Sequence, residues 1–347
     1  MSSARIGIVC NRLAKGGGME SHALGLVAEF SALGMMPVIF TKNHLPLEQL
    51  AGLEVHSCPT KLMPRPAEDV LFSAWLRRAK PKAGVSACIG FCRNTESDLL
   101  LCGGTHRGFC LHKEPETRKS LYDRVTIGFE ERAYGRVRFI LPASRLIASE
   151  LRELYTIEET RIRIAYPPVP RGKFACRTNE ERRRARAALG LSPDKTVLLF
   201  PSASGHERKG LPLILECLKG LTHIQLAVAG KPAAADNQTV VSIGYQTDMA
   251  TAYNAADYTI LASSYEPFGL VGVESVLCGT PTIFADTMGC TEVLSQRACR
   301  RFSRSDPESL RSILRHLKPG GRTDASDISY DYSAGHQAQM LLSLLDL

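Results

Sequence analysis

Short apolar runs alternate with longer amphipathic segments along the chain. Residues 5–10 (RIGIVC) form a β-branched run that is typical of a strand buried on both faces. Residues 19–33 carry apolar side chains at helical spacing and end at Gly34, and residues 36–41 (MPVIFT) predict the next strand. A strand, a glycine-containing loop, a helix and a second strand in this order predict the start of a βαβ unit.

The same alternation continues and then restarts after residues 162–170 (IRIAYPPVP), whose three prolines predict an extended connection and a domain boundary. We therefore predict an α/β protein with two doubly wound parallel sheets, in domains 1–168 and 169–328, followed by an apolar-faced helix in 329–347. Further strands are expected at 85–91, 97–102, 137–142, 196–201, 224–230, 240–243, 258–262 and 281–284, and further helices at 113–136, 148–155, 180–189, 211–221, 248–255 and 271–279.

The composition is that of an ordinary globular protein, with 44% hydrophobic and 22% charged residues among 347. The formal net charge of +8 favours anionic partners such as nucleotide phosphates, nucleic acid or an acidic membrane face. Simple solubility explains the same excess equally well.

The eleven cysteines include no CxxC pair, and the spacing of Cys88 and Cys92 has no matching second pair, so a zinc site is not expected. Many unpaired thiols point to a reducing compartment, which favours a cytoplasmic location. The first apolar run is too short for a signal peptide, and no run of 18 apolar residues predicts a membrane span.

Ligands of open parallel sheets bind at the carboxyl ends of the strands, where Gly16, Gly17 and Gly18 follow the first predicted strand. Glycines at this place let a phosphate or a sugar approach the backbone and the start of the following helix. A plain tight turn is the alternative. The spacing is not GxGxxG, and the second strand does not end in an acidic residue, so a nicotinamide dinucleotide site is poorly supported.

Two cations, Arg208 and Lys209, follow the strand TVLLFP in the segment SASGHERKG. Paired cations at a strand end suit a diphosphate, whose charge grows as its bond to a departing sugar breaks. This is not a Walker A loop, because the lysine precedes Gly210 and Leu211 replaces the Ser or Thr. An exposed charged loop is the alternative.

Two carboxylates, Glu266 and Glu274, lie eight residues apart around the predicted start of a helix. The helix start at Gly269, Leu270 and Val271 would present N–H groups to a phosphate, with one carboxylate for each polyol on either side. Residue types alone leave this interpretation and an ordinary acidic charge near a helix N-terminus about equally supported.

The segment EPFGLVGVE at 266–274 resembles the E-x7-E signature of family 4 glycosyltransferases. The segments CGTP at 278–281, YNAAD at 253–257 and RKG at 208–210 are similar to further parts of that family's pattern, and so is the first glycine loop. The segment GCTE at 289–292 departs from the usual GGxxE, because a cysteine replaces the second glycine and the glutamate comes one residue early.

The resemblance implies a GT-B fold, in which two Rossmann-like domains face a cleft and a C-terminal helix crosses back to the first. It also implies transfer from a nucleoside-diphosphate sugar with retention of configuration and without a metal, and no DxD motif occurs here. By the same resemblance, Arg208 and Lys209 hold the diphosphate, Glu274 the ribose and Glu266 the donor sugar. His106 would lie near the anomeric carbon, with a surface-loop histidine as the alternative.

The N-terminal domain of such enzymes takes the acceptor, for which Asp98 and Arg107 are weaker candidates. Residues 61–82 and 113–138 combine cations with aromatic side chains, which suits an anionic lipid surface and a solvated helix equally. The region GFCRN to DLLLC looks most like that of lipopolysaccharide-core hexosyltransferases. The expected partners are a nucleotide-sugar, a saccharide or glycolipid acceptor and the inner face of the inner membrane, with no nucleic acid and no cofactor.

Two other functions remain open from the sequence. A dinucleotide-dependent oxidoreductase also combines two Rossmann-like domains. A catalytically silent protein that binds nucleotide-sugars would carry the same binding residues.

Overall fold

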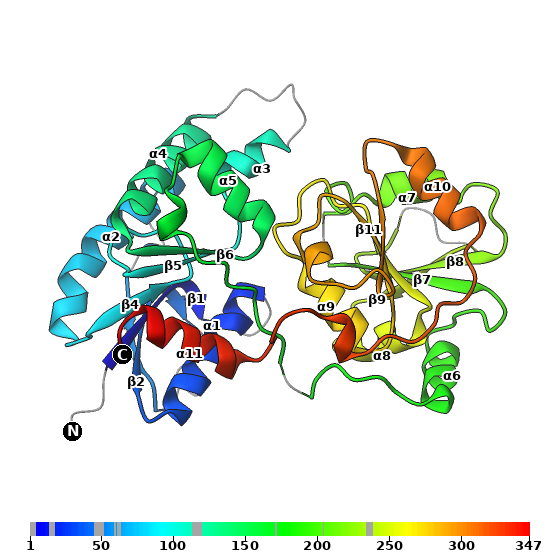
Figure 1. The fold of residues 1–347 in the computed structure, drawn as a ribbon, viewed down its shortest axis with the longest axis horizontal. Helices are drawn as coiled ribbons and strands as arrows, with labels where there is room; N and C mark the ends of the chain where they lie inside the picture. The colour runs from blue at the N-terminus through cyan, green and yellow to red at the C-terminus, as the bar shows by residue number, and fades with distance from the viewer. Residues whose placement is uncertain are drawn as a thin grey trace. The chain divides into compact units, whose positions relative to one another are not determined.

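The computed structural model describes residues 5–13, 18–44, 52–58, 60, 64–112, 120–170, 172–203, 205–233 and 239–347. It divides the chain into two compact units (Figure 1). Unit 1 comprises residues up to Val169 together with Tyr332–Leu347, and unit 2 is Pro170–Asp331.

Unit 1 is built on a six-stranded parallel sheet of order β3-β2-β1-β4-β5-β6. Its strands β4 and β5 are buried at every residue, as expected where helices cover both faces of a parallel sheet. Its elements are β1 (Arg5–Leu13), α1 (Gly18–Ala32), β2 (Met36–His44), β3 (Glu54–Ser57), α2 (Arg65–Lys82), β4 (Ala87–Gly90), β5 (Leu99–Cys102), α3 (His106–Leu111), α4 (Leu121–Arg136), β6 (Phe139–Pro142), α5 (Arg145–Tyr155) and the 3-10 turn η2 (Glu159–Arg161), with α11 (Ala334–Leu344) from the end of the chain.

The central strand β1 is held in register by both neighbours, since Ile8 lies opposite Ile39 of β2 and Ile89 of β4. Gly7 on this strand has no room for a side chain, because a Cβ there would lie 2.3 Å from Cys88 Sγ. One face of the sheet packs against α1 through a fully buried apolar cluster that includes Leu26 and Phe30.

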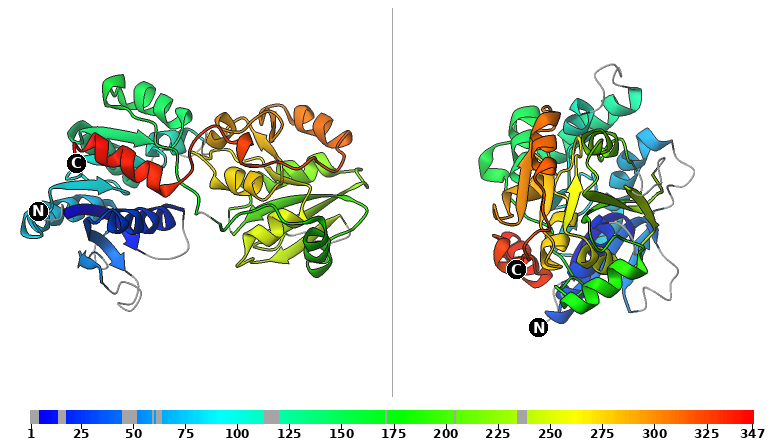
Figure 2. Two further views of the ribbon diagram at one scale, coloured as in Figure 1. Left: turned by 60° about the horizontal axis from the view of Figure 1, so that its bottom comes forward. Right: turned by 90° about the vertical axis from the view of Figure 1, so that its right-hand side faces the viewer.

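The final helix α11 packs beside α1 of unit 1 (Figure 2). Leu341 and Ala338 belong to the same apolar cluster as the residues of α1. A buried hydrogen bond joins His22 of α1 to Gln337 of α11, whose amide also donates to the Tyr166 carbonyl at 3.0 Å. The end of the chain is therefore part of the core of unit 1, as expected for the returning helix.

Unit 2 repeats the same plan with a second six-stranded parallel sheet, of order β12-β11-β10-β7-β8-β9. All seven residues of β7 are buried, which suits its central position. Its elements are α6 (Asn179–Ala188), β7 (Thr196–Ser202), α7 (Leu211–Leu218), β8 (Ile224–Gly230), β9 (Val240–Gly244), α8 (Met249–Ala255), β10 (Tyr258–Leu261), α9 (Leu270–Leu277), β11 (Thr282–Ala285), η3 (Gly289–Glu292), β12 (Cys299–Phe302), α10 (Pro307–Arg315) and η4 (Ala325–Asp327).

The two sheets have the same strand order. When the strands of each unit are counted from its own start, both follow 3-2-1-4-5-6, the order of the doubly wound dinucleotide fold. The strand order reverses direction between β1 and β4 in unit 1 and between β7 and β10 in unit 2. This confirms the prediction of two Rossmann-like parallel sheets, and it fixes a switch point in each unit where ligands of such sheets bind.

Within the part of the chain that the structure describes, every helix is too short or too polar to cross a lipid bilayer.

Candidate functional site

The candidate site of unit 2 lies at its switch point, where the loops after β7 and β10 lie side by side. The Ala262 amide donates to the Lys209 carbonyl at 3.1 Å, and the Ser264 amide donates to the Arg208 carbonyl at 2.8 Å. Gly210 ends the first loop with a φ of +76°, and a Cβ there would lie 2.1 Å from the Ala262 carbonyl oxygen. A glycine is therefore required where the two loops touch.

Lys209 is held at the carboxyl end of β7, because its ammonium donates to the Pro201 carbonyl at 2.9 Å. Burial lowers the pKa of Lys209, and the nearby carboxylates of Glu266 and Glu274 oppose that shift. Both predicted carboxylates thus act electrostatically on one predicted cation. The structure therefore brings these three residues into one charged group.

Arg208 pairs with Glu266 across the same two loops. Its Nη1 lies 3.3 Å from Glu266 Oε2 and donates to the Tyr265 carbonyl at 3.0 Å. The Arg208 side chain is 41% exposed against 20% for Glu266, so a ligand reaches the guanidinium more readily than the carboxylate. The Glu266 backbone is fixed in turn, since the Gly289 amide donates to its carbonyl at 3.0 Å.

Glu274 lies in the second turn of α9, which begins after Gly269 in a left-handed conformation with a φ of +90°. The Tyr253 hydroxyl of α8 donates to Glu274 Oε2 at 2.9 Å. Burial raises the pKa of Glu274, while the hydrogen bond from Tyr253 and the charges of Lys173 and Lys209 lower it. The glutamate is thus held in one orientation beside cations, as an acceptor for hydroxyl groups would be.

Leu270 and Val271 form the first turn of α9, so the structure begins this helix within the predicted segment from Gly269. Gly18 begins α1 at the carboxyl end of β1, and Gly16 and Gly17 lie outside the described residues.

Cys290, which replaces the second glycine of the family's GGxxE pattern, has a packing explanation. A Cβ on Gly272 of α9 would lie 2.7 Å from Cys290 Sγ, so the thiol occupies space that this glycine leaves open. The Cys290 amide donates to the Phe268 carbonyl at 2.7 Å. This loop therefore supports the segment that carries Glu266.

His106 is buried in unit 1 at the start of α3, with 7% of its surface exposed. Its Nε2 lies 2.8 Å from Asp123 Oδ1, and its backbone amide donates to Glu130 at 2.9 Å. The ring is therefore held by a carboxylate of α4, a partner that the sequence did not indicate.

Arg107 forms an ion pair with Glu131 and stacks over the Tyr155 ring, 5.0 Å from its centroid. Asp98 precedes β5, so it lies at the amino end of that strand rather than at the carboxyl end. It accepts the Cys88 amide at 2.7 Å and pairs with Lys80 at 3.0 Å. The structure thus does not bring Asp98 together with His106, which follows the other end of β5.

Among the described residues, His106, Cys110 and Asp123 each have one atom that could bind a metal, and these three atoms lie within 4.8 Å of one another. Here the histidine and the aspartate are hydrogen bonded to each other. The other carboxylate oxygen of Asp123 caps the start of α4 by accepting from Ser120.

Comparisons with known proteins match both halves of the chain. Residues 181–317 match the family model described as glycosyl transferases group 1, and residues 16–173 match the one described as glycosyltransferase family 4. A probable transglycosylase of Burkholderia thailandensis is 38% identical over 351 residues, which cover 97% of this chain and 95% of that protein.

Solved structures share the fold. WaaG, described as a glycosyltransferase involved in lipopolysaccharide biosynthesis, superposes with a TM-score of 0.75 at 18% identity, over 98% of this chain and 97% of that chain. HepE of Anabaena, in complex with UDP and glucose, superposes with a TM-score of 0.65 at 13% identity, over 98% and 97% of the two chains.

Proposed function

Because the chain belongs to the glycosyl transferases group 1 and glycosyltransferase family 4, we propose that it moves a hexose from a nucleoside-diphosphate sugar to a saccharide or glycolipid acceptor. A UDP-sugar is the favoured donor. The observation that carries the proposal is the pair of hydrogen-bonded loops at the switch point of unit 2, where Arg208 Nη1 lies 3.3 Å from Glu266 Oε2 and the Ala262 amide donates to the Lys209 carbonyl.

The two cations stabilise the departing diphosphate. Arg208 and Lys209 lie in the loop between β7 and α7, and Lys209 is held in place by the Pro201 carbonyl. Negative charge grows on the diphosphate as the bond to the sugar breaks, and positioned cations lower the energy of that transition state. These two side chains supply the positive charge that the reaction needs, so the proposed transfer does not depend on a metal.

The two carboxylates orient the donor. Glu274, held by the Tyr253 hydroxyl, accepts hydrogen bonds from the ribose hydroxyls. Glu266 exchanges its contact with Arg208 for the hydroxyls of the donor sugar when the diphosphate takes up the guanidinium. No side chain is required to form a covalent intermediate, and we propose that the new bond retains the anomeric configuration.

The acceptor belongs to lipopolysaccharide core or a related cell-envelope glycan. The resemblance to WaaG, described as involved in lipopolysaccharide biosynthesis, supports this assignment through the fold.

We propose that His106 contacts the donor sugar near the reacting carbon once the second substrate is bound. The choice of a UDP-sugar as donor is supported by HepE, which shares the fold and whose structure holds UDP and glucose.

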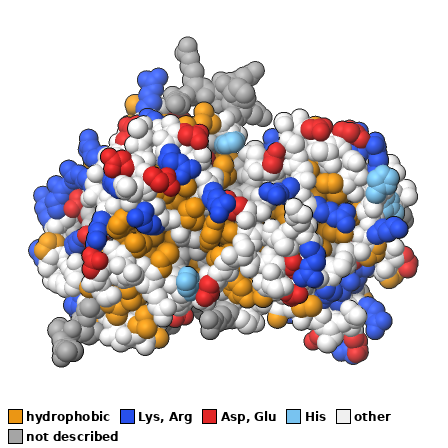
Figure 3. All heavy atoms as spheres, viewed as in Figure 1, with side chains coloured by type: hydrophobic (Ala, Val, Ile, Leu, Met, Phe, Trp, Pro, Cys, Tyr) orange, Lys and Arg blue, Asp and Glu red, His pale blue; other side chains and the backbone are white. Residues whose placement is uncertain are grey.

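A cytoplasmic protein with a peripheral contact to an anionic membrane completes the proposal. Leu111 at the end of α3 and Leu121 at the start of α4 are 65% and 75% exposed, beside the exposed Tyr122 and Arg124. Apolar and cationic side chains together suit an anionic lipid surface. On the face shown in Figure 3, basic side chains are interspersed with acidic and apolar ones, so such a contact would be local.

Nucleotide binding and product formation test the proposal. UDP or GDP should raise the melting temperature of the protein, and NAD should leave it unchanged. Mass spectrometry of reactions with a panel of nucleotide-sugars and cell-envelope acceptors should then show a product heavier by one hexose. A shift with NAD alone would favour an oxidoreductase, and a nucleotide-sugar that binds without hydrolysis or transfer would favour a silent binding protein.

A further inference from the structure

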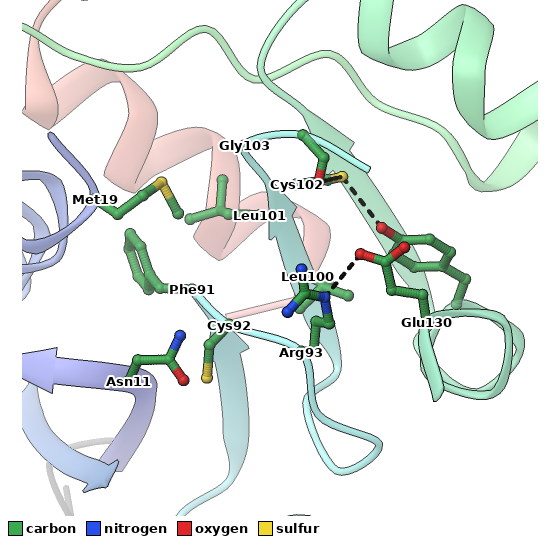
Figure 4. A pocket seen from close by; sticks show the side chains of 12 residues that line it. Asn11, Met19, Phe91, Cys92, Arg93, Leu100, Leu101, Cys102, Gly103 and Glu130 are labelled. Atoms are coloured by element: carbon green, nitrogen blue, oxygen red, sulfur yellow. Dashed lines mark hydrogen bonds and ion pairs between the residues drawn. The ribbon is translucent and has the colours of Figure 1, made fainter. Parts of the chain in front are cut away.

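Unit 1 contains a pocket of about 220 Å³ at its own switch point (Figure 4). Its wall comes from the carboxyl-terminal parts of β1 and β5, from the residues that follow β4 and from α4. The rule that places ligands at the switch point of unit 2 applies equally to unit 1, because the two sheets have the same strand order. The pocket therefore lies where ligands of such sheets bind.

The pocket is sized for a single ring. Sites for drug-sized ligands usually enclose roughly 300–1,000 Å³, so a smaller volume accommodates one sugar ring rather than an oligosaccharide. Figure 4 shows Met19, Phe91 and Asn11 on one side of the pocket, with Arg93 and Glu130 on the other. Apolar and aromatic surface with a few polar groups is the lining that a sugar ring needs.

Arg93 supplies the cation in the lining of this pocket. Glu130 is 1% exposed and already accepts three hydrogen bonds, from Arg93 Nε at 2.8 Å, from the His106 amide at 2.9 Å and from the Tyr155 hydroxyl. Arg93 is 33% exposed, and its Nη1 lies 3.6 Å from Asp69. The guanidinium is therefore anchored through Nε and lies near a second carboxylate through Nη1, while Nη2 forms no hydrogen bond or ion pair with the described residues.

We propose that this pocket binds one sugar or cyclitol ring of the second substrate, and that Arg93 pairs with a phosphate or carboxylate on that ring. A guanidinium matches both groups through paired N–H donors, and its fork is held in place here by the buried Glu130. The inference rests on the proposed function, which requires an acceptor besides the nucleotide-sugar. It makes Arg93 the residue that selects an acidic acceptor.

The methyl group of Met19 reports on this pocket in the intact protein. The chain has eight methionines, so a sample with 13C-labelled methionine methyl groups gives few signals, and a Met19→Leu variant identifies the one in the pocket. The titrants are D-glucose 6-phosphate, D-glucuronate, D-glucose and inorganic phosphate. Either acidic sugar should shift the Met19 signal at a concentration at least about tenfold lower than glucose requires, as a charge-assisted pair predicts.

The Arg93→Gln variant should bind the acidic sugars only as weakly as glucose, while Arg152→Gln, at an exposed ion pair with Glu159, should behave as the wild type. If Arg93→Gln does not fold, the wild-type titrations remain decisive. Equal shifts by glucose would refute the role of Arg93, and equal shifts by inorganic phosphate would refute a site for a ring. If neither acidic sugar shifts the Met19 signal, the pocket does not bind the second substrate as proposed. The donor site is tested separately by the rise in melting temperature with UDP.

Discussion

The hydroxyl of Tyr253 donates a 2.9 Å hydrogen bond to Oε2 of Glu274. The tyrosine is 1% exposed and comes from α8, whereas the glutamate comes from α9. One buried side chain thus sets the orientation of the carboxylate that we assign to the ribose of the donor.

Tyr253→Phe removes only the hydroxyl and should lower kcat/KM for the donor by about tenfold, the effect of one hydrogen bond to a charged group. The ring still fills its place in the core, so the melting temperature should change little. Steady-state kinetics and thermal unfolding of the same samples check this. Unchanged kinetics would mean that Tyr253 does not orient a residue that acts on the donor.

Glu274→Gln should raise the stability of the free protein at neutral pH. Burial raises the pKa of Glu274, so the folded state binds its proton more tightly than the unfolded chain does, and the ionised carboxylate costs stability above that pKa. The gain should therefore shrink as the pH falls and Glu274 becomes protonated in the wild type. Thermal unfolding at about pH 8 and about pH 4.5 measures the difference. An equal gain in stability at the two pH values would contradict the raised pKa of Glu274. The Glu274→Gln variant should have lost its activity at both pH values.

Lys209→Ala should abolish transfer, with a loss of at least about a hundredfold in kcat, because a half-buried, positioned cation at the leaving group is worth several kcal/mol in the transition state. The fold should survive, since β7 and α7 keep their backbone contacts. Lys219→Ala is the matched control, because that lysine is 72% exposed at the end of α7 and pairs with the exposed Glu216. Wild-type rates for Lys209→Ala would remove the lysine from the site.

Glu266→Ala should also abolish transfer while leaving UDP binding close to that of the wild type. The carboxylate is assigned to the sugar and not to the nucleotide, and its loss frees Arg208 for the diphosphate. Inhibition by UDP and turnover of the nucleotide-sugar, measured on the same variant, separate these two effects. Glu216→Ala, at an exposed surface position, serves as the control. A loss of UDP binding equal to the loss of turnover would place Glu266 at the nucleotide instead.

Gly272→Ala should destabilise unit 2 by about 1–3 kcal/mol, the usual cost of overpacking, because the new methyl group would lie 2.7 Å from Cys290 Sγ and 3.0 Å from the Phe284 ring. Adding Cys290→Gly to this variant should restore part of the loss. A double-mutant cycle in urea gives the coupling between the two positions. Additive effects would show that the thiol and the glycine do not share this space.

The alternating pattern predicted most of both sheets, because strands buried on both faces are continuous apolar runs that stand out in a sequence. It missed β3 (Glu54–Ser57) and β12 (Cys299–Phe302), which lie at the sheet edges and keep exposed or partly exposed residues. It indicated α2 only as the alternative of a solvated helix within 61–82, because Pro81 lies inside the helix and hides the helical pattern. Edge strands and a proline-containing helix depend on tertiary contacts that no local pattern records.

The family was recognised from the spacing of Glu266 and Glu274, and both matching family models and the relative that spans nearly the whole chain confirm it. The sequence could not show that Tyr253 positions Glu274, although the tyrosine belongs to a segment that resembled the family. It also could not show that Arg93 pairs with Glu130, because this pairing joins the segment after β4 to a helix 37 residues further on. Such pairs follow from the topology of the sheet.

Unit 2 is an uninterrupted segment, whereas unit 1 needs residues from both ends of the chain. During synthesis, unit 2 can therefore acquire its full core before unit 1 can, since Ala338 and Leu341 leave the ribosome after the whole of unit 2. A premature stop after residue 331 would expose the apolar face of α1 and leave unit 2 intact. When residues 332–347 are missing, chaperones and proteases should therefore recognise unit 1 rather than unit 2.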